Sequence, residues 1–385
     1  MIRRQLGTLI CAVILLATHF DIQLLSAQGN MKTIPFYIGT YTSGSSKGIH
    51  RSELNLADGT MSAPKLVAEL ENPTFLAVHP TADVLYSISE VRRGGKRENA
   101  QVMAYKIAAD GSLQELGGKP AGGDGPCFVS TDKAGKFAFV ANYGSGSVSA
   151  YSLGASGELL ASVSNIQHVG KSVDPARQEG PHAHCILIDP SDKYVCAVDL
   201  GLDQVVIYSL DRTAGALTNT GKPFKATPGF GPRHLAFHPN GKHAFVIHEM
   251  ASQLSSCSWD ASSGTMTEIQ HLSTLPSDFS GSTSTAEVLV HPNGKFVYGS
   301  NRGHDSISVF SFDEASGKLA LIGHTATKGQ TPRNFRIDPT GSYLLAQNQG
   351  SDSIYSFRID AAKGSLEQVG EPITVGSPCC IKFFR

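Results

Sequence analysis

Short segments in which apolar and polar residues alternate recur along most of the chain. Clear examples are residues 102–107, 205–210, 307–312 and 354–359. Alternation with a period of two is typical of strands that bury one face, whereas apolar residues at helical spacing are scarce in this sequence. The pattern therefore predicts an all-β protein.

A turn that contains glycine follows these segments and leads into a new strand. Glycine at this position provides the positive φ that tight hairpins require. The turn occurs seven times, at Asp58-Gly59, Asp110-Gly111, Ser156-Gly157, Ala214-Gly215, Ser263-Gly264, Ser316-Gly317 and Lys363-Gly364. Seven equivalent hairpins predict a repeat protein rather than a chain of unrelated domains.

A second repeated unit consists of a strand that usually begins at proline, a turn, and a strand that ends in polar residues. Its full copies begin at Pro73, Pro126, Ala183, Pro232, Thr285 and Pro332. The seventh copy is split, because Pro378 to Phe384 forms its first strand and Phe36 to Tyr41 forms the next. We therefore expect a seven-bladed β-propeller of four-stranded antiparallel blades, whose ring is closed by N- and C-terminal strands that share one blade.

Residues 1–27 have the features of a secretory signal peptide. Arg3 and Arg4 form a basic segment, Leu6 to Ala17 is apolar, and Ala27 is a small residue suited to cleavage. The apolar run is shorter than the roughly 20 residues that span a bilayer. We expect an exported protein, periplasmic or extracellular, with residues 28–385 as one propeller domain and no membrane attachment after cleavage. A retained N-terminal anchor is the alternative.

The charge balance indicates the class of partner. The chain has 32 Lys and Arg residues against 33 Asp and Glu residues, a net charge of −1. Such a balance provides no basic surface for nucleic acid or anionic membranes. Small molecules are therefore the expected partners.

Six of the seven cysteines lie after residue 27, and none of them forms a Cys-x-x-Cys pair. A zinc or thioredoxin-like site therefore has little support. Cys185 and Cys196 flank a short hairpin turn. Buried free thiols are the expected state of this pair, and a disulfide is the alternative.

Strand register predicts a ligand site, because the first strand of a blade begins at the edge where the second strand ends. The position after the leading residue of each copy holds Thr74, Cys127, His184, Arg233, Ala286, Arg333 and Cys379. The end of the second strand holds Glu90, Tyr143, Leu200, Glu249, Arg302 and Gln349. Positions that only pack would hold similar residues in every blade. The mixture of acids, bases and guanidiniums instead indicates a functional site at one mouth of the central channel.

Structural roles compete with this interpretation at several positions. Asn142 and Asn301 precede the strand-end residues and could bind a ligand or cap turns through side-chain hydrogen bonds. Glu249 could be catalytic or could neutralise Arg233, and His234 could hydrogen-bond within the wall. A structural role is expected for His79, His238 and His291, which lie near the opposite edge.

Five segments resemble those of the seven-bladed 6-phosphogluconolactonase family, which includes the fungal carboxy-cis,cis-muconate lactonising enzyme. They are residues 180–184, 199–203, 229–234, 300–303 and 332–335, and the resemblance extends from Tyr37 to the C-terminus. It implies a lactone site at the channel mouth that uses no metal and no cofactor. The family's proposed catalytic set corresponds to His184 (or His182), Arg233, Glu249 and Arg302.

We therefore predict hydrolysis of a sugar-acid lactone similar to 6-phosphogluconolactone, with a small anionic lactone or sugar acid as the partner. Glu249 or His184 would be the general base, and Arg233 would stabilise the oxyanion. Arg302 and Arg333 would hold an anionic group of the substrate. The residues expected to contact substrate are His182, His234, Arg333, Asn142 and Asn301.

The sequence is also compatible with four alternatives. The family's phosphogluconolactonases act in the cytosol, whereas this chain carries an export signal, so the substrate could be another lactone. The same site could form a lactone from a muconate. A calcium site could use the oxygen ligands of Glu90, Asn142, Asp199, Glu249 and Asn301. A non-enzymatic envelope scaffold is the fourth possibility.

Overall fold

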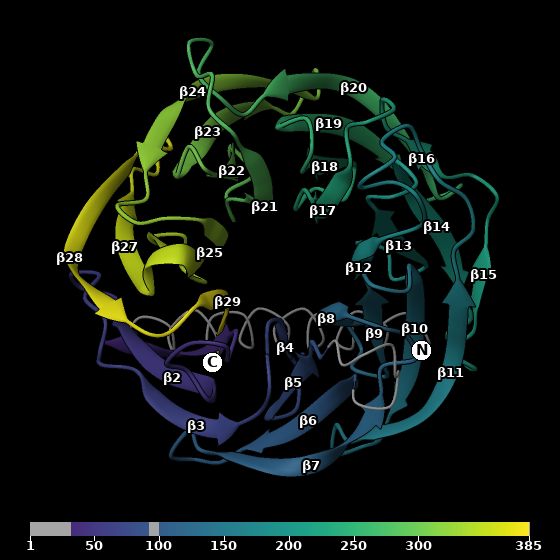
Figure 1. Cartoon of the computed structure of the whole chain (residues 1–385), viewed down its shortest axis with the longest axis horizontal. Helices are drawn as coiled ribbons and strands as arrows, with labels where there is room; N and C mark the ends of the chain where they lie inside the picture. The colour runs from purple at the N-terminus through teal and green to yellow at the C-terminus, as the bar shows by residue number, and fades with distance from the viewer. Residues whose placement is uncertain (1–31, 92–99, 385) are drawn as a thin grey trace, which may run out of the picture.

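The computed structural model describes residues 32–91 and 100–384. The predicted signal peptide, residues 1–27, lies outside this part of the chain. Seven β-sheets are arranged in a ring around a central axis, as Figure 1 shows. No helix within the described ranges is long and apolar enough to cross a membrane.

Each blade is an antiparallel sheet, and in all but the first its four main strands follow sequence order from the axis to the rim. The first blade contains β29 (Pro378–Phe383), β1 (Thr33–Thr40), β2 (Gly48–Asn55) and β3 (Lys65–Glu69). The second contains β4 (Leu76–Val78), β5 (Val84–Ser89), β6 (Gln101–Ile107) and β7 (Leu113–Pro120). The third contains β8 (Pro126–Thr131), β9 (Phe137–Asn142), β10 (Ser147–Leu153) and β11 (Leu159–Gln167).

The other blades repeat this plan. The fourth contains β12 (Ala183–Ile188), β13 (Tyr194–Asp199), β14 (Gln204–Leu210) and β15 (Leu217–Asn219), with β16 (Phe224–Lys225) also paired to β14. The fifth contains β17 (Pro232–Phe237), β18 (His243–His248), β19 (Gln253–Asp260) and β20 (Thr265–Ser273). The sixth contains β21 (Ser284–Val290), β22 (Phe296–Arg302), β23 (Ser306–Asp313) and β24 (Lys318–Ala326). The seventh contains β25 (Pro332–Ile337), β26 (Tyr343–Asn348), β27 (Ser353–Ile359) and β28 (Leu366–Thr374), with the 3-10 turn η2 (Gln349–Ser351) after β26.

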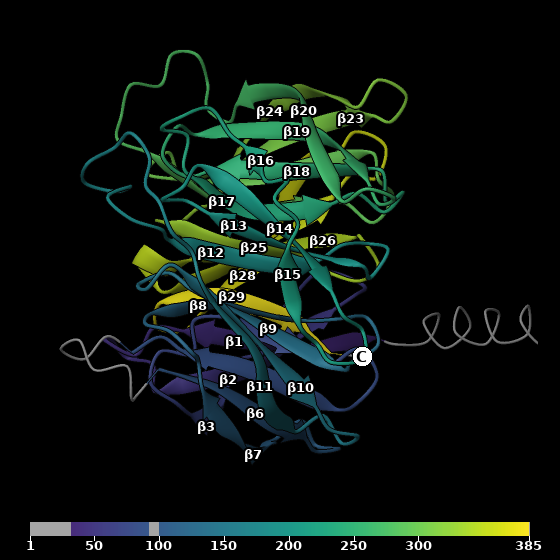
Figure 2. The same ribbon diagram turned by 90° about the vertical axis from the view of Figure 1, so that its right-hand side faces the viewer.

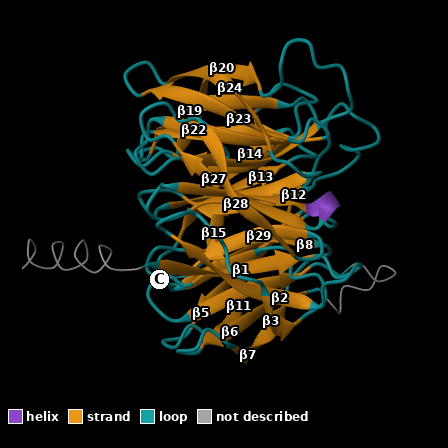
Figure 3. Cartoon of the chain, turned by 90° about the vertical axis from the view of Figure 1, so that its left-hand side faces the viewer, coloured by secondary structure: helices purple, strands orange, loops and turns teal. Residues whose placement is uncertain are grey.

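The ring closes as the sequence predicted, because β29 pairs with β1 in the first blade. Phe36 faces Phe383 and Ile38 faces Ile381 across this antiparallel pair. The seven innermost strands, β4, β8, β12, β17, β21, β25 and β29, contact one another in succession around the axis. The loops that join the strands gather at the two ends of the ring (Figure 2, Figure 3). The predicted seven-bladed fold is confirmed.

The repeated turn glycines dock each blade onto its neighbour. All seven have φ between +63° and +83°, as the hairpin pattern predicted. A Cβ on Gly264 would lie 2.4 Å from the ring of Tyr194, and one on Gly364 would lie 2.4 Å from the ring of Phe296. Glycine is therefore required at these turns for two reasons: it adopts the positive φ, and it leaves space for the side chain of the neighbouring blade.

Three histidines join neighbouring blades at the edge of the ring where the innermost strands end. His79, His238 and His291 place Nε2 at 3.0, 2.8 and 2.8 Å from the carbonyl oxygen of a turn glycine in the next blade. Their Nδ1 atoms accept hydrogen bonds from backbone N–H groups of their own turns. Nε2 therefore carries the proton and donates it to the neighbouring carbonyl. This is the structural role that the sequence indicated.

The six cysteines of the described residues are buried and free. Cys185 lies opposite Val198, and Cys196 lies opposite Leu187. The two thiols are therefore offset along the hairpin rather than directly paired, and burial raises the pKa of both. Free buried thiols are the state expected for this pair.

We expect Gly264→Ala to lower the free energy of unfolding by about 2–4 kcal/mol, because a methyl group adds a clash to left-handed backbone strain. Gly221→Ala is the matched control, since its φ is +70° and nothing lies within 4 Å of its Cβ position. It should lose only about 1–2 kcal/mol from backbone strain. Urea-induced unfolding followed by circular dichroism measures both values. Equal losses would show that blade docking does not depend on this contact.

Candidate active site

A polar cavity of about 490 Å³ lies where the innermost strands begin. Its lining consists of Tyr41, Glu71, Asn72, Glu90, Cys127, Tyr143, Arg177, His184, Glu249, Arg302 and Arg333. A narrow extension shares Cys127, His184 and Arg333 with the cavity and adds, among others, Arg233 and His234. The two strand ends that the sequence analysis placed at one mouth therefore meet there.

A β-bulge at the start of the innermost strand aims two consecutive side chains at the channel. In β17, Pro232 pairs with His248 and His234 pairs with Ile247, so Arg233 is an extra residue without a cross-strand partner. The register shifts by one residue at this point in six blades. The extra residue is Cys127, His184, Arg233, Arg333 or Cys379 in five of them, and in β21 Ala286 and Glu287 together lie opposite Ser300. A bulge interrupts the alternation of side chains, which explains why Arg233 and His234 both line the extension.

Three arginines from different elements surround the carboxylate of Glu249, the residue that follows β18. One oxygen contacts Nη2 of Arg177 at 2.6 Å. The other lies 3.0 Å from Nε of Arg233 and 3.0 Å from Nη2 of Arg302. Arg233 and Arg302 also donate to the backbone carbonyls of Ala286 and Thr285, at 2.5 and 2.7 Å. Glu249 therefore orients the guanidiniums of the site.

This cluster controls the charge of its members. Burial favours the neutral acid form of Glu249, but Arg302, Arg233 and Arg177 outweigh it and lower its pKa to about 2. Burial and the neighbouring Arg333 and Arg302 lower the pKa of Arg233 to about 9. Both groups are therefore ionised at neutral pH.

His184 is a buried imidazole that lines the cavity. Burial, together with the charges of Arg233, His234 and Arg333, lowers its pKa well below the ordinary value of 6.5. Its ring lies edge-on to those of Tyr143 and His234, with centroids 5.5 and 5.1 Å away. Its Nδ1 is buried and has no hydrogen-bond partner among the described residues. At neutral pH, His184 is therefore an uncharged imidazole with an unengaged ring nitrogen.

His234, in contrast, has both ring nitrogens engaged. Its Nδ1 lies 2.8 Å from Oε1 of Glu287, whose other carboxylate oxygen accepts a hydrogen bond from Asn334. Nη1 of Arg233 lies 3.3 Å from its Nε2. Burial outweighs the nearby Glu287 and lowers the pKa of His234 to about 4. The neutral ring therefore donates from Nδ1 and accepts at Nε2, which suits a wall residue.

Arg333 is the arginine of the site without a close acidic partner. No carboxylate of the described residues lies within 4 Å of its guanidinium, which sits 5.5 Å from the ring centroid of Tyr41. Glu90 instead accepts hydrogen bonds from Tyr41 at 2.9 Å and from Thr74 at 2.8 Å. Arg333 lines both the cavity and its extension, so its charge is available to an anion.

Three expected ligand contacts lie outside the lining. Asn142 and Asn301 are buried and donate to the carbonyls of Ala121 and Thr274, at 3.2 and 2.8 Å. Their expected placement is corrected because successive strand residues face opposite sides, so only the following Tyr143 and Arg302 face the cavity. The ring of His182 stacks on that of Tyr143, with centroids 4.6 Å apart, and its Nδ1 bonds the backbone carbonyl of Tyr143. His182 therefore contacts a lining residue but does not line the cavity itself.

The sequence did not indicate several lining or supporting residues, among them Arg177, Tyr41 and Glu287. Arg177 belongs to the loop between β11 and β12, outside the repeat, so no register argument could find it. Tyr41 occupies in the split blade the position that Tyr143 holds in the third blade, and extending the alignment there would have found it. Glu287 follows Ala286, the residue that the strand register assigned to the site in this blade. Only the bulge in β21 brings Glu287 close to the site, and the sequence did not predict that bulge.

The oxygen ligands considered for calcium do not come together. The Asp199 carboxylate is buried, accepts the backbone N–H groups of His182 and Leu202, and lies 2.6 Å from Nδ1 of His168. Asn142 and Asn301 also point away from the cavity. Within residues 32–91 and 100–384, no group of three or more His, Cys, Asp or Glu residues is arranged to hold a metal ion.

Comparison with known proteins gives a consistent family. Residues 35–383 match the family model described as "Lactonase, 7-bladed beta-propeller". A 6-phosphogluconolactonase of Bacillus subtilis is 40% identical over 303 residues, which cover 78% of this chain and 84% of the relative. The solved structure of a periplasmic gluconolactonase of Pseudomonas aeruginosa is similar with a TM-score of 0.86 at 30% identity, covering 92% of this chain and 99% of that one. The chain therefore belongs to the seven-bladed β-propeller lactonase family.

Proposed function

We propose that the protein hydrolyses a sugar-acid lactone in the polar cavity. The observation that carries this proposal is the neutral, unengaged imidazole of His184 beside a cluster of arginines. Ester hydrolysis needs a base for water and positive charge for the oxyanion, and both are present here. The names of the Bacillus and Pseudomonas relatives support a lactone of gluconic acid or of its 6-phosphate as the substrate.

In the proposed mechanism, the neutral imidazole of His184 removes a proton from water as the water oxygen bonds to the lactone carbonyl carbon. Arg233 and Arg333, which line the narrow extension with His184, stabilise the resulting oxyanion. The ring C–O bond then breaks, and the imidazolium returns its proton to the departing alkoxide. The product is the open hydroxy acid.

Glu249 acts in this proposal as a positioning residue. A carboxylate with a pKa of about 2 is a weak base for activating water at neutral pH, and its oxygens are shared among three arginines. Of the two bases that the sequence suggested, His184 therefore fits the mechanism better.

Arg302 and Arg177 would hold the anionic group of the substrate. Both line the wide cavity but not the extension, so they lie farther out than His184. Guanidiniums bind phosphate and carboxylate through paired N–H donors. The Arg177 side chain is 43% exposed, which leaves it accessible to a group at the rim.

We also propose that the protein works outside the cytoplasm. Residues 1–27 have the composition of a signal peptide, and the Pseudomonas relative is named a periplasmic gluconolactonase. An extracytoplasmic location favours a plain aldonolactone over a phosphorylated one.

The proposal is tested by acid release in a pH-stat from glucono-1,5-lactone, its 6-phosphate and δ-valerolactone. Turnover of either sugar lactone, with little turnover of δ-valerolactone, is the expected result. The ratio of the two kcat/KM values identifies the substrate. Absence of enzymatic hydrolysis for all three lactones would refute the function.

His184→Asn should lower kcat by about 10²–10⁴-fold, the usual contribution of a general base. His182→Asn is the matched control, because His182 is two residues away and lies outside the cavity lining. Its kcat should change less than about threefold. Steady-state kinetics on the better sugar lactone measures both. A similar decrease in kcat for the two variants would show that His184 is not the general base.

The pH dependence of kcat/KM should report the lowered pKa of His184. The free base is present above that pKa and is lost as the pH falls through it, so the acidic limb should lie below pH 6.5. If Glu249 were the base, activity would persist toward its pKa of about 2. The profile is measured after subtraction of spontaneous hydrolysis. An acidic limb at or above pH 6.5 would contradict the assignment.

Arg177→Met should raise KM for 6-phosphogluconolactone about tenfold or more, because a charge-assisted phosphate contact is lost. The effect on glucono-1,5-lactone should be smaller, since that substrate has no phosphate. Arg212→Met is the matched control, because Arg212 also forms a 2.6 Å ion pair and is 42% exposed, but lies outside the site. Equal KM changes for both lactones would exclude Arg177 as the phosphate contact.

A further inference from the structure

A second cavity, of about 610 Å³, lies at the other end of the innermost strands. In β25, Arg333 lines the active-site cavity, whereas Arg336 and Ile337 line the second one. In β29, Cys379 lines the active-site extension and Lys382 lines the second cavity. The two cavities therefore occupy opposite mouths of the ring.

A plug of side chains separates the two mouths. The rings of Phe75 and Phe128 stack with centroids 4.0 Å apart, and His234 lies edge-on to them at 6.0 and 5.3 Å. Of the residues that the structure describes, none lines both the second cavity and either part of the active site. A molecule in the second cavity would therefore bind independently of the lactone site.

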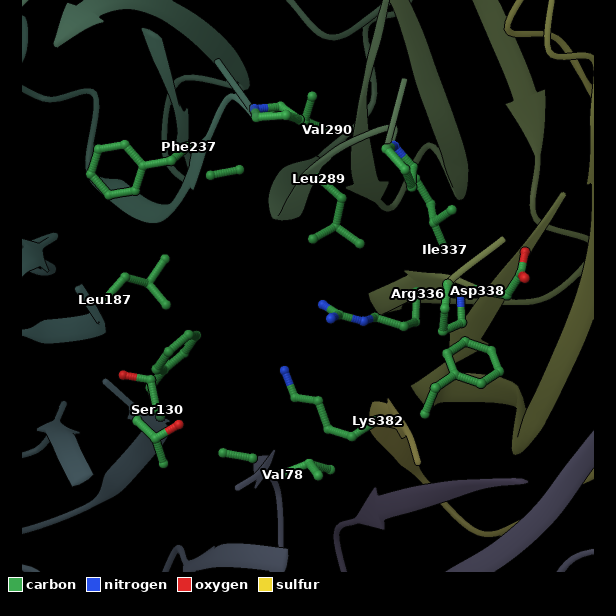
Figure 4. Close-up of a pocket in the computed structure, with 18 of the residues that line it drawn as sticks. Val78, Ser130, Leu187, Phe237, Leu289, Val290, Arg336, Ile337, Asp338 and Lys382 are labelled. Carbon is green, nitrogen blue, oxygen red and sulfur yellow. The ribbon is translucent and has the colours of Figure 1, made fainter. Parts of the chain in front are cut away.

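The walls of this cavity differ in character from those of the active site. Val78, Leu187, Phe237, Leu289 and Ile337 provide apolar surface around the mouth (Figure 4). The polar Ser130 uses its hydroxyl to donate to the carbonyl of Ile186 at 2.6 Å. Such walls suit a hydrocarbon or aromatic body and offer few partners to a polyhydroxylated sugar.

Two cations project into this apolar space. Figure 4 shows the side chains of Arg336 and Lys382 extending side by side into the cavity. Among the residues that the structure describes, no carboxylate lies within 4 Å of either cation; Glu287 forms its ion pair with His234 instead. Burial and the charge of Arg336 lower the pKa of Lys382. Its ammonium lies 4.6 Å from the ring centroid of Phe75, a cation–π contact that only partly replaces water.

The acid of the lining does not neutralise these cations. Asp338 accepts hydrogen bonds from the backbone N–H groups of Tyr343 at 2.6 Å and of Thr340 at 2.8 Å. Its carboxylate is therefore engaged in stabilising the turn between β25 and β26. The cavity retains two positive charges in apolar surroundings, where an anion would relieve their repulsion.

We propose that this second mouth binds a carboxylate with an apolar body. The carboxylate bridges Arg336 and Lys382, and the aliphatic or aromatic part packs against the apolar walls. Two paired cations select a carboxylate over a neutral alcohol of the same length. The apolar walls select it over short acids and over the polar products of lactone hydrolysis.

Isothermal titration calorimetry with octanoate as the probe tests the proposal on the intact protein. Octanoate should bind at least about tenfold more tightly than 1-octanol, octylamine or acetate, because only octanoate has both the charge and the tail. Arg336→Met and Lys382→Met should each weaken octanoate binding about tenfold or more. Excess glucono-1,5-lactone should not compete.

Lys65→Met is the matched control, since Lys65 is exposed on the outermost strand β3 and should leave octanoate affinity unchanged. Circular dichroism separates loss of binding from loss of fold, and Arg336→Met provides a second variant if Lys382→Met does not fold. Equal affinity for octanoate and 1-octanol, equal weakening by Lys65→Met, or absence of octanoate binding would overturn the proposal. Each of these outcomes is independent of whether the protein hydrolyses lactones.

Discussion

Some innermost strands present two consecutive side chains to the channel, as β17 does with Arg233 and His234, although a regular strand turns successive residues to opposite faces. A bulge near the start of six of the innermost strands allows this by adding one residue without a cross-strand partner. His184, Arg233 and Arg333 are the chemically important members of that set. Because the neighbouring residue also faces inward, the same feature provides His234 and Asn334, which fill the plug beneath the cavity. One irregularity, repeated around the ring, therefore supplies the part of the polar site that the innermost strands line, while Glu249 and Arg302 come from the ends of second strands.

The charges of the site depend on one another. A single carboxylate, that of Glu249, contacts three guanidiniums, and a fourth guanidinium, that of Arg333, has no such partner. Burial, together with the surplus of positive charge, lowers the pKa of His184 and keeps its imidazole neutral. Anion recognition and the supply of a free base are therefore two results of the same electrostatic arrangement. The second mouth contains a similar surplus in apolar surroundings, which would change the class of anion that fits.

The architecture could be predicted from sequence because every blade repeats the same turn glycine and the same pair of strands. A copy with a weak pattern can therefore be assigned by alignment with the other copies. The strand-end register also brought His184, Arg233, Glu249, Arg302 and Arg333 to one mouth. It misplaced Asn142 and Asn301 because a one-residue step changes the face of a strand. It missed Arg177, which lies in a loop without counterparts, and Glu287, which lies next to an unforeseen bulge. Repetition in sequence thus predicts the features that all blades share. Features that differ between blades, such as the loop with Arg177, become apparent only in the three-dimensional structure.

The pairing of β1 with β29 has a kinetic consequence. The Sγ of Cys379 lies 3.6 Å from the carbonyl oxygen of Gly39, although the two residues are 340 positions apart. Closing so long a loop is entropically slow, so this seam should form late in folding, after blades made of adjacent residues. Until then β1 has an open edge available for pairing with other chains. Because β29 contributes to both mouths, neither binding cavity is complete before the seam closes, and ligand capture at either end would report the final folding step.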